Sequence, residues 1–93
     1  MKMRVAIAWF QDIFEEATKL MPAVDPVDMD LDTAIKMNFE CVNYFEAEFP
    51  TQAECEASIF KQLFVANWTA VDSQSLMQRW DDDSKEWVSC GHF

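Results

Sequence analysis

The spacing of apolar residues predicts a helix in the first segment of the chain, from about Lys2 to Met21. Its apolar residues recur at helical steps: Val5, Trp9, Ile13, Ala17 and Leu20. This spacing sets them on one helical face, and Pro22 follows where the helix would end. Val5, Ile7 and Trp9 also occupy alternate positions, so a short leading strand is the alternative for residues 1–10.

A second helix is predicted after a connection over residues 22–30, which contains Pro22 and Pro26. Asp28 or Asp30 would cap it, and it runs to about Phe49. Its apolar positions step by four, four, three, three and four, the clearest helical pattern in the chain: Leu31, Ile35, Phe39, Val42, Phe45 and Phe49.

A third helix is predicted after Pro50, because the run Thr51-Gln52-Ala53-Glu54 has the pattern of a capping box. Thr51 would accept from the amide of Glu54, while the Glu54 carboxylate reaches back to the Thr51 amide. The helix would end near Asn67 and bury four apolar residues: Ile59, Phe60, Leu63 and Phe64. The short connection before it indicates that the second and third helices pack as a hairpin.

The last quarter of the chain predicts an antiparallel β-hairpin. A polar loop separates Trp80 from Trp87, which would face each other across the two strands and stabilise them by roughly 0.2–1 kcal/mol. The run from Gln78 to Ser89 resembles the second hairpin of the immunoglobulin-binding domain of protein G, where an Asp-Asp-x-Thr-Lys loop separates paired aromatic residues. The resemblance implies hairpin geometry alone. Residues 65–73 form either a third strand or an extension of the third helix.

Together these patterns predict an α+β fold dominated by helices, with three helices followed by a C-terminal antiparallel hairpin. The 93 residues suit a single domain, 1–93, with one core. One glycine and three prolines leave few positions for tight turns, which favours helices with short connections.

Charge narrows the range of partners. Seventeen acids against seven bases give a net charge of −10, and Lys19 and Lys36 are the only bases among twelve acids between Val5 and Phe60. Such a field repels nucleic acids and anionic membranes and attracts basic surfaces. We therefore expect a larger protein with a basic surface as the partner, for example a nucleic-acid-processing complex. The alternative is that the charge only keeps the chain soluble.

The sequence carries no recognisable catalytic, cofactor or metal motif, so we expect no enzyme activity and no cofactor. Asp28, Asp30 and Asp32 begin like a calcium loop, but Thr33 and Phe39 stand where that loop needs glycine and glutamate. Three cysteines without close pairing, and no leading or membrane-spanning apolar run, predict a cytoplasmic protein, in the host cytoplasm if a phage encodes it.

The candidate partner-binding residues are acids and aromatics. The acids are Asp25, Asp28, Asp30, Asp32, Glu40, Glu46, Glu48, Glu54, Glu56, Asp81, Asp82 and Asp83. Thirteen aromatic residues are many for a core of this size, and an exposed patch would include Trp68, Trp80, Trp87, Tyr44 and Phe93. Packing of the hairpin against the helices is the alternative use of these rings.

The chain thus reads as an acidic protein-binding module that inhibits or regulates a larger protein. Its size and charge resemble those of small acidic proteins of phages and mobile elements, including anti-restriction and anti-CRISPR inhibitors. That resemblance implies nucleic-acid mimicry, in which carboxylates occupy a channel lined by lysine and arginine. The alternative is a small structural or assembly subunit that acts through homo-oligomerisation, with a homodimer as the simplest form. Whether the acids share one face is left open by the sequence.

Overall fold

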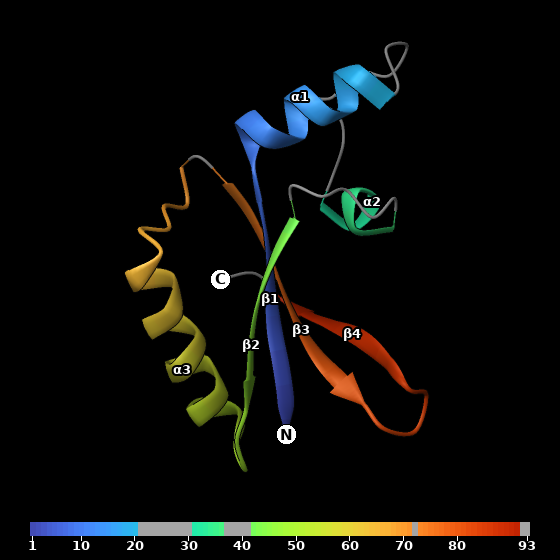
Figure 1. The fold of residues 1–93 in the computed structure, drawn as a ribbon. Helices are drawn as coiled ribbons and strands as arrows, with labels where there is room; N and C mark the ends of the chain where they lie inside the picture. The colour runs from blue at the N-terminus through green and yellow to red at the C-terminus, as the bar shows by residue number, and fades with distance from the viewer. Residues whose placement is uncertain (21–30, 37–41, 72, 92–93) are drawn as a thin grey trace.

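A four-stranded antiparallel sheet runs through the centre of the molecule (Figure 1). The computed structural model describes residues 1–20, 31–36, 42–71 and 73–91. In chain order the elements are β1 Lys2–Trp9, α1 Phe10–Leu20, α2 Leu31–Lys36, β2 Val42–Glu48, α3 Gln52–Val65, β3 Ser73–Asp81 and β4 Glu86–Gly91. The strand order across the sheet is β2-β1-β3-β4.

β1 is a central strand, paired antiparallel with β2 on one side and with β3 on the other. β2 and β3 therefore run parallel to each other, and α3 connects them along the chain. This arrangement is a split βαβ unit with β1 inserted between its two strands. β4 returns beside β3 as the second strand of a hairpin.

α3 covers one face of the sheet. Met3, Val5 and Ile7 are fully buried at alternate positions of β1, and they form one cluster with apolar residues of α3. The α3 residues in this cluster repeat every four positions: Cys55, Ile59 and Leu63. The alternation of a strand and the four-residue step of a helix thus meet in one core.

α1 and α2 cover part of the opposite face of the sheet, at the end where β1 finishes (Figure 1). Ala6 and Ala8 of β1 are fully buried there, in a cluster with Ile13 of α1 and with Leu31 and Ala34 of α2. Alanine side chains on the strand let helix side chains approach the sheet closely. The half of this face nearer the N-terminus carries larger and more exposed side chains.

The predicted helix-dominated layout, three helices followed by a hairpin, is wrong: strands and helices take about equal shares of the described residues, and these elements are interleaved. At the N-terminus the strand alternative is correct for Lys2–Trp9, and the helix begins at Phe10. The second predicted helix is helical only over Leu31–Lys36 among the described residues, and Val42–Glu48 is a strand. The predicted packing of two helices as a hairpin is wrong for the same reason.

The misread helix has a physical explanation. A step of four residues is even, so it keeps two side chains on one face of a strand as well as on one face of a helix. An odd step distinguishes the two structures only where one face of the strand is apolar, and β2 has apolar residues on both faces, so its three-residue step was also read as helical. Val42 and Phe45, three residues apart, lie in the clusters on opposite faces of the sheet, as a strand requires.

The third helix is confirmed, and so is half of its capping box. Thr51 is the N-cap of α3, and its hydroxyl accepts from the Glu54 amide at 3.3 Å. The Glu54 carboxylate accepts from the Thr51 hydroxyl at 3.0 Å, where the sequence predicted a bond to the Thr51 amide. Ile59 and Leu63 are buried as predicted, whereas Phe60 and Phe64 are 58% and 79% exposed.

The C-terminal hairpin is also confirmed. Trp80 pairs directly with Trp87, and the ladder extends to Asp81 and Glu86, so the turn is shorter than the predicted loop. Lys85 closes this turn with a φ of 54°. α3 ends at Val65 and β3 starts at Ser73, so the described residues between them, 66–71, belong neither to an extension of the third helix nor to a third strand.

Candidate functional site

The exposed half of the sheet face opposite α3 carries a group of aromatic residues around one arginine. We call Arg4, Tyr44, Trp80 and Trp87 the aromatic sheet face. The pairing of the strands brings them together. Ala6 of β1 pairs with Tyr44 of β2, and Arg4, two residues before Ala6, lies on the same face of the sheet. Arg4 pairs in turn with Gln78, two residues before Trp80, which faces Trp87. Four strands thus contribute to one surface.

Arg4 lies between the rings of the two outer strands. Its guanidinium carbon is 4.3 Å from the ring centroid of Tyr44 on β2 and 4.2 Å from that of Trp87 on β4. Its Nε donates to Oε1 of Gln78 at 2.8 Å. Cation–π contacts of this kind stabilise by roughly 0.5–2 kcal/mol each, depending on solvent exposure. Arg4 therefore ties together all four strands and fixes the positions of the two rings.

The two hairpin tryptophans pack edge to face. Their ring centroids are 5.4 Å apart with an interplanar angle of 71°, an arrangement that suits the charge distribution of aromatic rings. Lys2 adds a second cation, with Nζ 5.7 Å from the centroid of the Trp87 ring. Trp80 and Trp87 remain half-buried and Tyr44 is 40% exposed, so parts of all three rings reach the solvent.

Burial lowers the pKa of the Arg4 guanidinium, while the nearby Tyr44 and Glu46 act in the opposite direction. Because an arginine begins with a very high pKa, Arg4 still carries its charge near neutral pH. Its hydrogen-bond acceptor, Gln78, is itself buried at 7% exposure. The guanidinium is therefore committed to internal contacts, and we regard Arg4 as a positioning residue for the rings.

Carboxylates flank the aromatic sheet face on two sides. Glu46 and Glu48 occupy alternate, exposed positions of β2 on this face, and Asp82 and Asp83 are exposed in the β3–β4 turn. We call these four residues the acidic rim. Among the described residues, one ion pair is shorter than 4.0 Å, and it joins Lys19 to Glu16 on α1. The carboxylates of the acidic rim therefore form no such pair with the described residues. Asp81 differs, because its carboxylate accepts from the Asp83 amide and the Ser84 hydroxyl within the turn.

The other predicted binding residues that the structure describes do not join this site. Asp32 and Glu54 lie in the first turns of α2 and α3, and Glu56, in the next turn of α3, accepts from Gln52 at 3.0 Å. Trp68 packs in the α3 cluster, on the face opposite Trp80 and Trp87. Five predicted residues lie outside the described residues: Asp25, Asp28, Asp30, Glu40 and Phe93.

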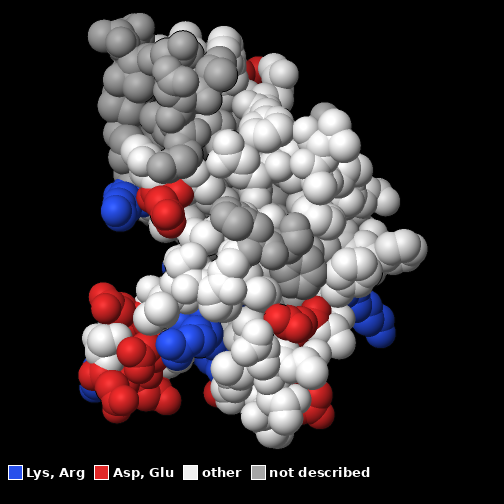
Figure 2. Space-filling model, turned by 180° about the vertical axis from the view of Figure 1, so that it is seen from behind, with Lys and Arg blue, Asp and Glu red and all other residues white. Residues whose placement is uncertain are grey.

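The described acids do not form one continuous surface. Figure 2 shows acidic side chains gathered at the corner that holds the β3–β4 turn, while other acids on this view are separated from them by basic and uncharged side chains. Glu46 and Glu48 lie on the face opposite the one that α3 covers. What the fold brings together is a smaller unit, three rings with carboxylates at two edges.

Sequence reasoning missed Arg4, because the opening residues were read first as a helix. Once residues 2–9 are a strand, Lys2, Arg4, Ala6 and Ala8 share one face. Two cations at the start of an otherwise apolar strand then mark the point where this face becomes exposed. The alternation was the signal available in the sequence.

No group of three or more metal-binding side chains occurs in the part of the chain that the structure describes. Within the same residues, no helix has the length and apolar character needed to cross a membrane. Comparisons with protein-family models, with curated proteins and with solved structures found no match to this chain.

Proposed function

We propose that this protein is an acidic binding module that docks on a basic surface of a larger protein through the aromatic sheet face and its acidic rim. The observation that carries this proposal is the cluster of Tyr44, Trp80 and Trp87 around Arg4, partly exposed beside carboxylates that have no ion-pair partner among the described residues.

The chemistry of this surface suits lysine- and arginine-rich ligands. Carboxylates bind guanidinium and ammonium groups through charge-assisted hydrogen bonds. The rings of Tyr44 and Trp87 already contact this chain's own cations, so they would contribute apolar contact area beside the carboxylates. Tryptophan and tyrosine are also enriched among the residues that dominate binding energy at protein interfaces. The net charge of −10 would increase the rate of encounter with a basic partner.

The specific role we propose is inhibition or regulation of a nucleic-acid-processing protein, in the manner of small acidic inhibitors of phages and mobile elements. A nucleic-acid channel presents closely spaced lysine and arginine side chains. The acidic rim would engage these cations in place of phosphates, and the tryptophans would provide apolar contact area. Size and net charge support this role, together with the aromatic sheet face.

Titration with lysine- and arginine-rich peptides, monitored by tryptophan fluorescence across a salt series, tests the proposal. We expect binding that weakens as salt rises, because the rim contributes through charge. The double variant Glu46→Gln/Glu48→Gln should weaken binding by about tenfold, as expected for loss of two interfacial charge contacts. Asp12→Asn/Glu15→Gln on α1 removes the same charge elsewhere and is the matched control.

Equal weakening by both double variants would show that only overall charge matters, and would refute the assignment of the site. Binding that is insensitive to salt would refute the proposed role of the carboxylates. Capture from a host lysate at low and high salt, followed by mass spectrometry, then identifies which basic proteins the module retains.

A further inference from the structure

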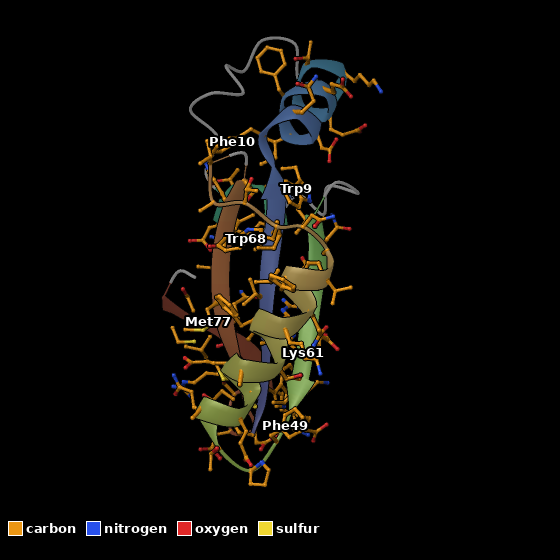
Figure 3. All side chains as sticks on the ribbon, turned by 90° about the vertical axis from the view of Figure 1, so that its left-hand side faces the viewer. Trp9, Phe10, Phe49, Lys61, Trp68 and Met77 are labelled. Atoms are coloured by element: carbon orange, nitrogen blue, oxygen red, sulfur yellow. The ribbon has the colours of Figure 1, made fainter. Side chains whose placement is uncertain are left out.

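The outward side of α3 carries a second apolar surface, separate from the one that packs on the sheet. Ala53, Ala57, Phe60 and Phe64 recur at steps of four, three and four, and all four are exposed. We call these four residues the outer stripe of α3. Helical geometry places them away from Cys55, Ile59 and Leu63, which face the core. Figure 3 views the molecule from the α3 side, with the helix in front of the sheet.

The exposure of this stripe is high for large apolar side chains. Phe64 is 79% exposed, and the neighbouring Val65 is 76% exposed. A surface helix normally turns polar residues to the solvent, and contiguous exposed apolar residues mark interaction sites. The stripe therefore has the character of an interface.

The order of residues along the stripe shows what fits it. Its N-terminal half holds the small residues Ala53 and Ala57, and its C-terminal half holds the large residues Phe60 and Phe64. A second copy of α3 laid antiparallel would place Phe64 of each copy over Ala53 of the other. A parallel copy would instead set phenylalanine against phenylalanine and leave the alanines facing each other across a gap.

Charges beside the stripe agree with the antiparallel arrangement. Lys61 is the only base of α3, and Glu54 lies seven residues before it, which is about two helical turns and hence the same side of the helix. In an antiparallel pair related by a two-fold axis, the same sides of the two helices meet. Lys61 of each copy then lies near Glu54 of the other, whereas a parallel pair would not bring these two levels together.

We propose that α3 is the interface of a homodimer, in which two outer stripes pack antiparallel around a two-fold axis. The shape and charge of the stripe are self-complementary, as an isologous interface requires. The occupant is a second copy of this chain. The inference does not depend on the proposed function.

The dimer would leave the aromatic sheet faces open, because α3 and these rings lie on opposite faces of the sheet. Each dimer would present two binding faces. A ligand that carries two basic segments at a matching distance would then bind with greater avidity than either face alone provides.

Sedimentation equilibrium of the purified chain over a wide concentration range is the first test. We expect a monomer–dimer equilibrium that Phe64→Glu weakens by about tenfold or more, since it places a charge in the centre of the interface. Phe14→Glu is the matched control, because Phe14 is a 52% exposed phenylalanine on α1. Circular dichroism of both variants reports that the fold is intact.

A charge exchange tests the antiparallel register itself. Lys61→Glu places like charges at both Lys61–Glu54 contacts of its homodimer, and Glu54→Lys does the same with the opposite sign. A mixture of the two variants restores two opposite-charge contacts in the heterodimer. We expect each variant alone to dimerise more weakly than the wild type, and the mixture to form heterodimers in preference to either homodimer.

A chain that stays monomeric at every concentration would overturn the proposal. A dimer that Phe64→Glu leaves unchanged, or a variant mixture with no preference for the heterodimer, would overturn the assignment of α3 as the antiparallel interface. Variants of the acidic rim should leave the dimer unchanged, so failure of the proposed function and failure of this inference are separate results.

Discussion

Arg4 performs a structural task that usually falls to an apolar residue on a small sheet. It occupies the middle of the exposed half of the face, where its guanidinium lies between the rings of Tyr44 and Trp87 and donates to Gln78. The planar cation suits this position, because it can contact two rings through its faces and one acceptor through its edge. Two of the three candidate binding rings therefore contact this one side chain, and the third, Trp80, packs against Trp87.

Replacing Arg4 by leucine should lower the free energy of unfolding by about 1–3 kcal/mol, because it removes two cation–π contacts and leaves the buried Gln78 without its donor. Arg4→Lys should fall between leucine and the wild type, since an ammonium keeps the charge without the planar group. Urea denaturation measures all three. Arg79→Leu, at an exposed position of β3, should change stability by less than about 0.5 kcal/mol. An equal loss in both leucine variants would contradict the role of Arg4.

The two described cysteines differ in their environments, and we predict different reactivities. Cys55 is fully buried, whereas Cys90 is half-buried with Sγ 3.4 Å from the carbonyl oxygen of Met77. Burial raises the pKa of the Cys90 thiol; Arg79 lowers it and Glu56 raises it further. In a Cys41→Ser background, iodoacetamide should label Cys90 before Cys55.

The labelling rate of Cys90 should reach its half-maximum at a higher pH than for the same cysteine in denaturant, because the thiolate is the reactive form and a raised pKa delays its appearance. Peptide mass spectrometry identifies the labelled site at each pH. Earlier labelling of Cys55, or a half-maximum at or below the denatured value, would contradict the environment described for Cys90.

At the scale of elements, the sequence predicted those structures that have local signals. α3 has its capping residue at Thr51, and the β3–β4 hairpin has paired tryptophans on either side of a polar turn. Neither of these two signals involves residues that are distant in the sequence. β1 and β2 lack such signals and form by pairing with each other and with β3 across long stretches of chain. The four-residue step from Val5 to Trp9 in β1 fits both periods, and β2 is apolar on both faces, so its three-residue step from Val42 to Phe45 also fits a helix. Only the pairing decides in favour of strands.

The same contrast applies to the candidate site. Trp80, Trp87 and the turn acids could be predicted, because they belong to the hairpin. Arg4 and the role of Tyr44 could not, because Arg4 comes near these residues only when β1 enters the sheet between β2 and β3. The exposure of Phe60 and Phe64 was likewise hidden, since α3 is apolar on two sides and its sequence does not show which side meets the sheet.

The cap of α3 gives a prediction at this scale. Thr51→Ala removes the hydroxyl that accepts from the Glu54 amide, and should lower stability by about 1 kcal/mol. Thr18→Ala on α1 is the matched control, because the Thr18 hydroxyl donates to the Phe14 carbonyl within a helix, and its loss should change stability by less than about 0.5 kcal/mol. Urea denaturation of both variants measures the difference. Equal effects would show that the cap does not stabilise α3.

At the scale of the whole molecule, apolar surface and charge are divided between the two sides of the sheet. One side carries α3 with its exposed outer stripe, and the other carries the aromatic sheet face with its acidic rim. The surface proposed for a basic partner and the surface proposed for a second copy would therefore act without competing. The two should also respond oppositely to salt, because one depends on attraction between unlike charges and the other brings together two chains of net charge −10.

This net charge also leads to a prediction for folding. The molecule measures 44 × 32 × 18 Å, so at an ionic strength of about 0.01 M, where screening extends roughly 30 Å, its acids repel one another across most of the structure. At about 0.15 M the screening length falls to roughly 8 Å, and only near neighbours still interact. Salt weakens few stabilising ion pairs in return, because Lys19–Glu16 on α1 is the one ion pair shorter than 4.0 Å among the described residues.

We therefore expect the thermal unfolding midpoint, measured by circular dichroism at neutral pH, to rise when sodium chloride is increased over this range. The rise should be smaller in Asp12→Asn/Glu15→Gln, which carries less of the charge that salt screens. A midpoint that falls with salt would mean that specific ion pairs stabilise the fold more than the net charge destabilises it.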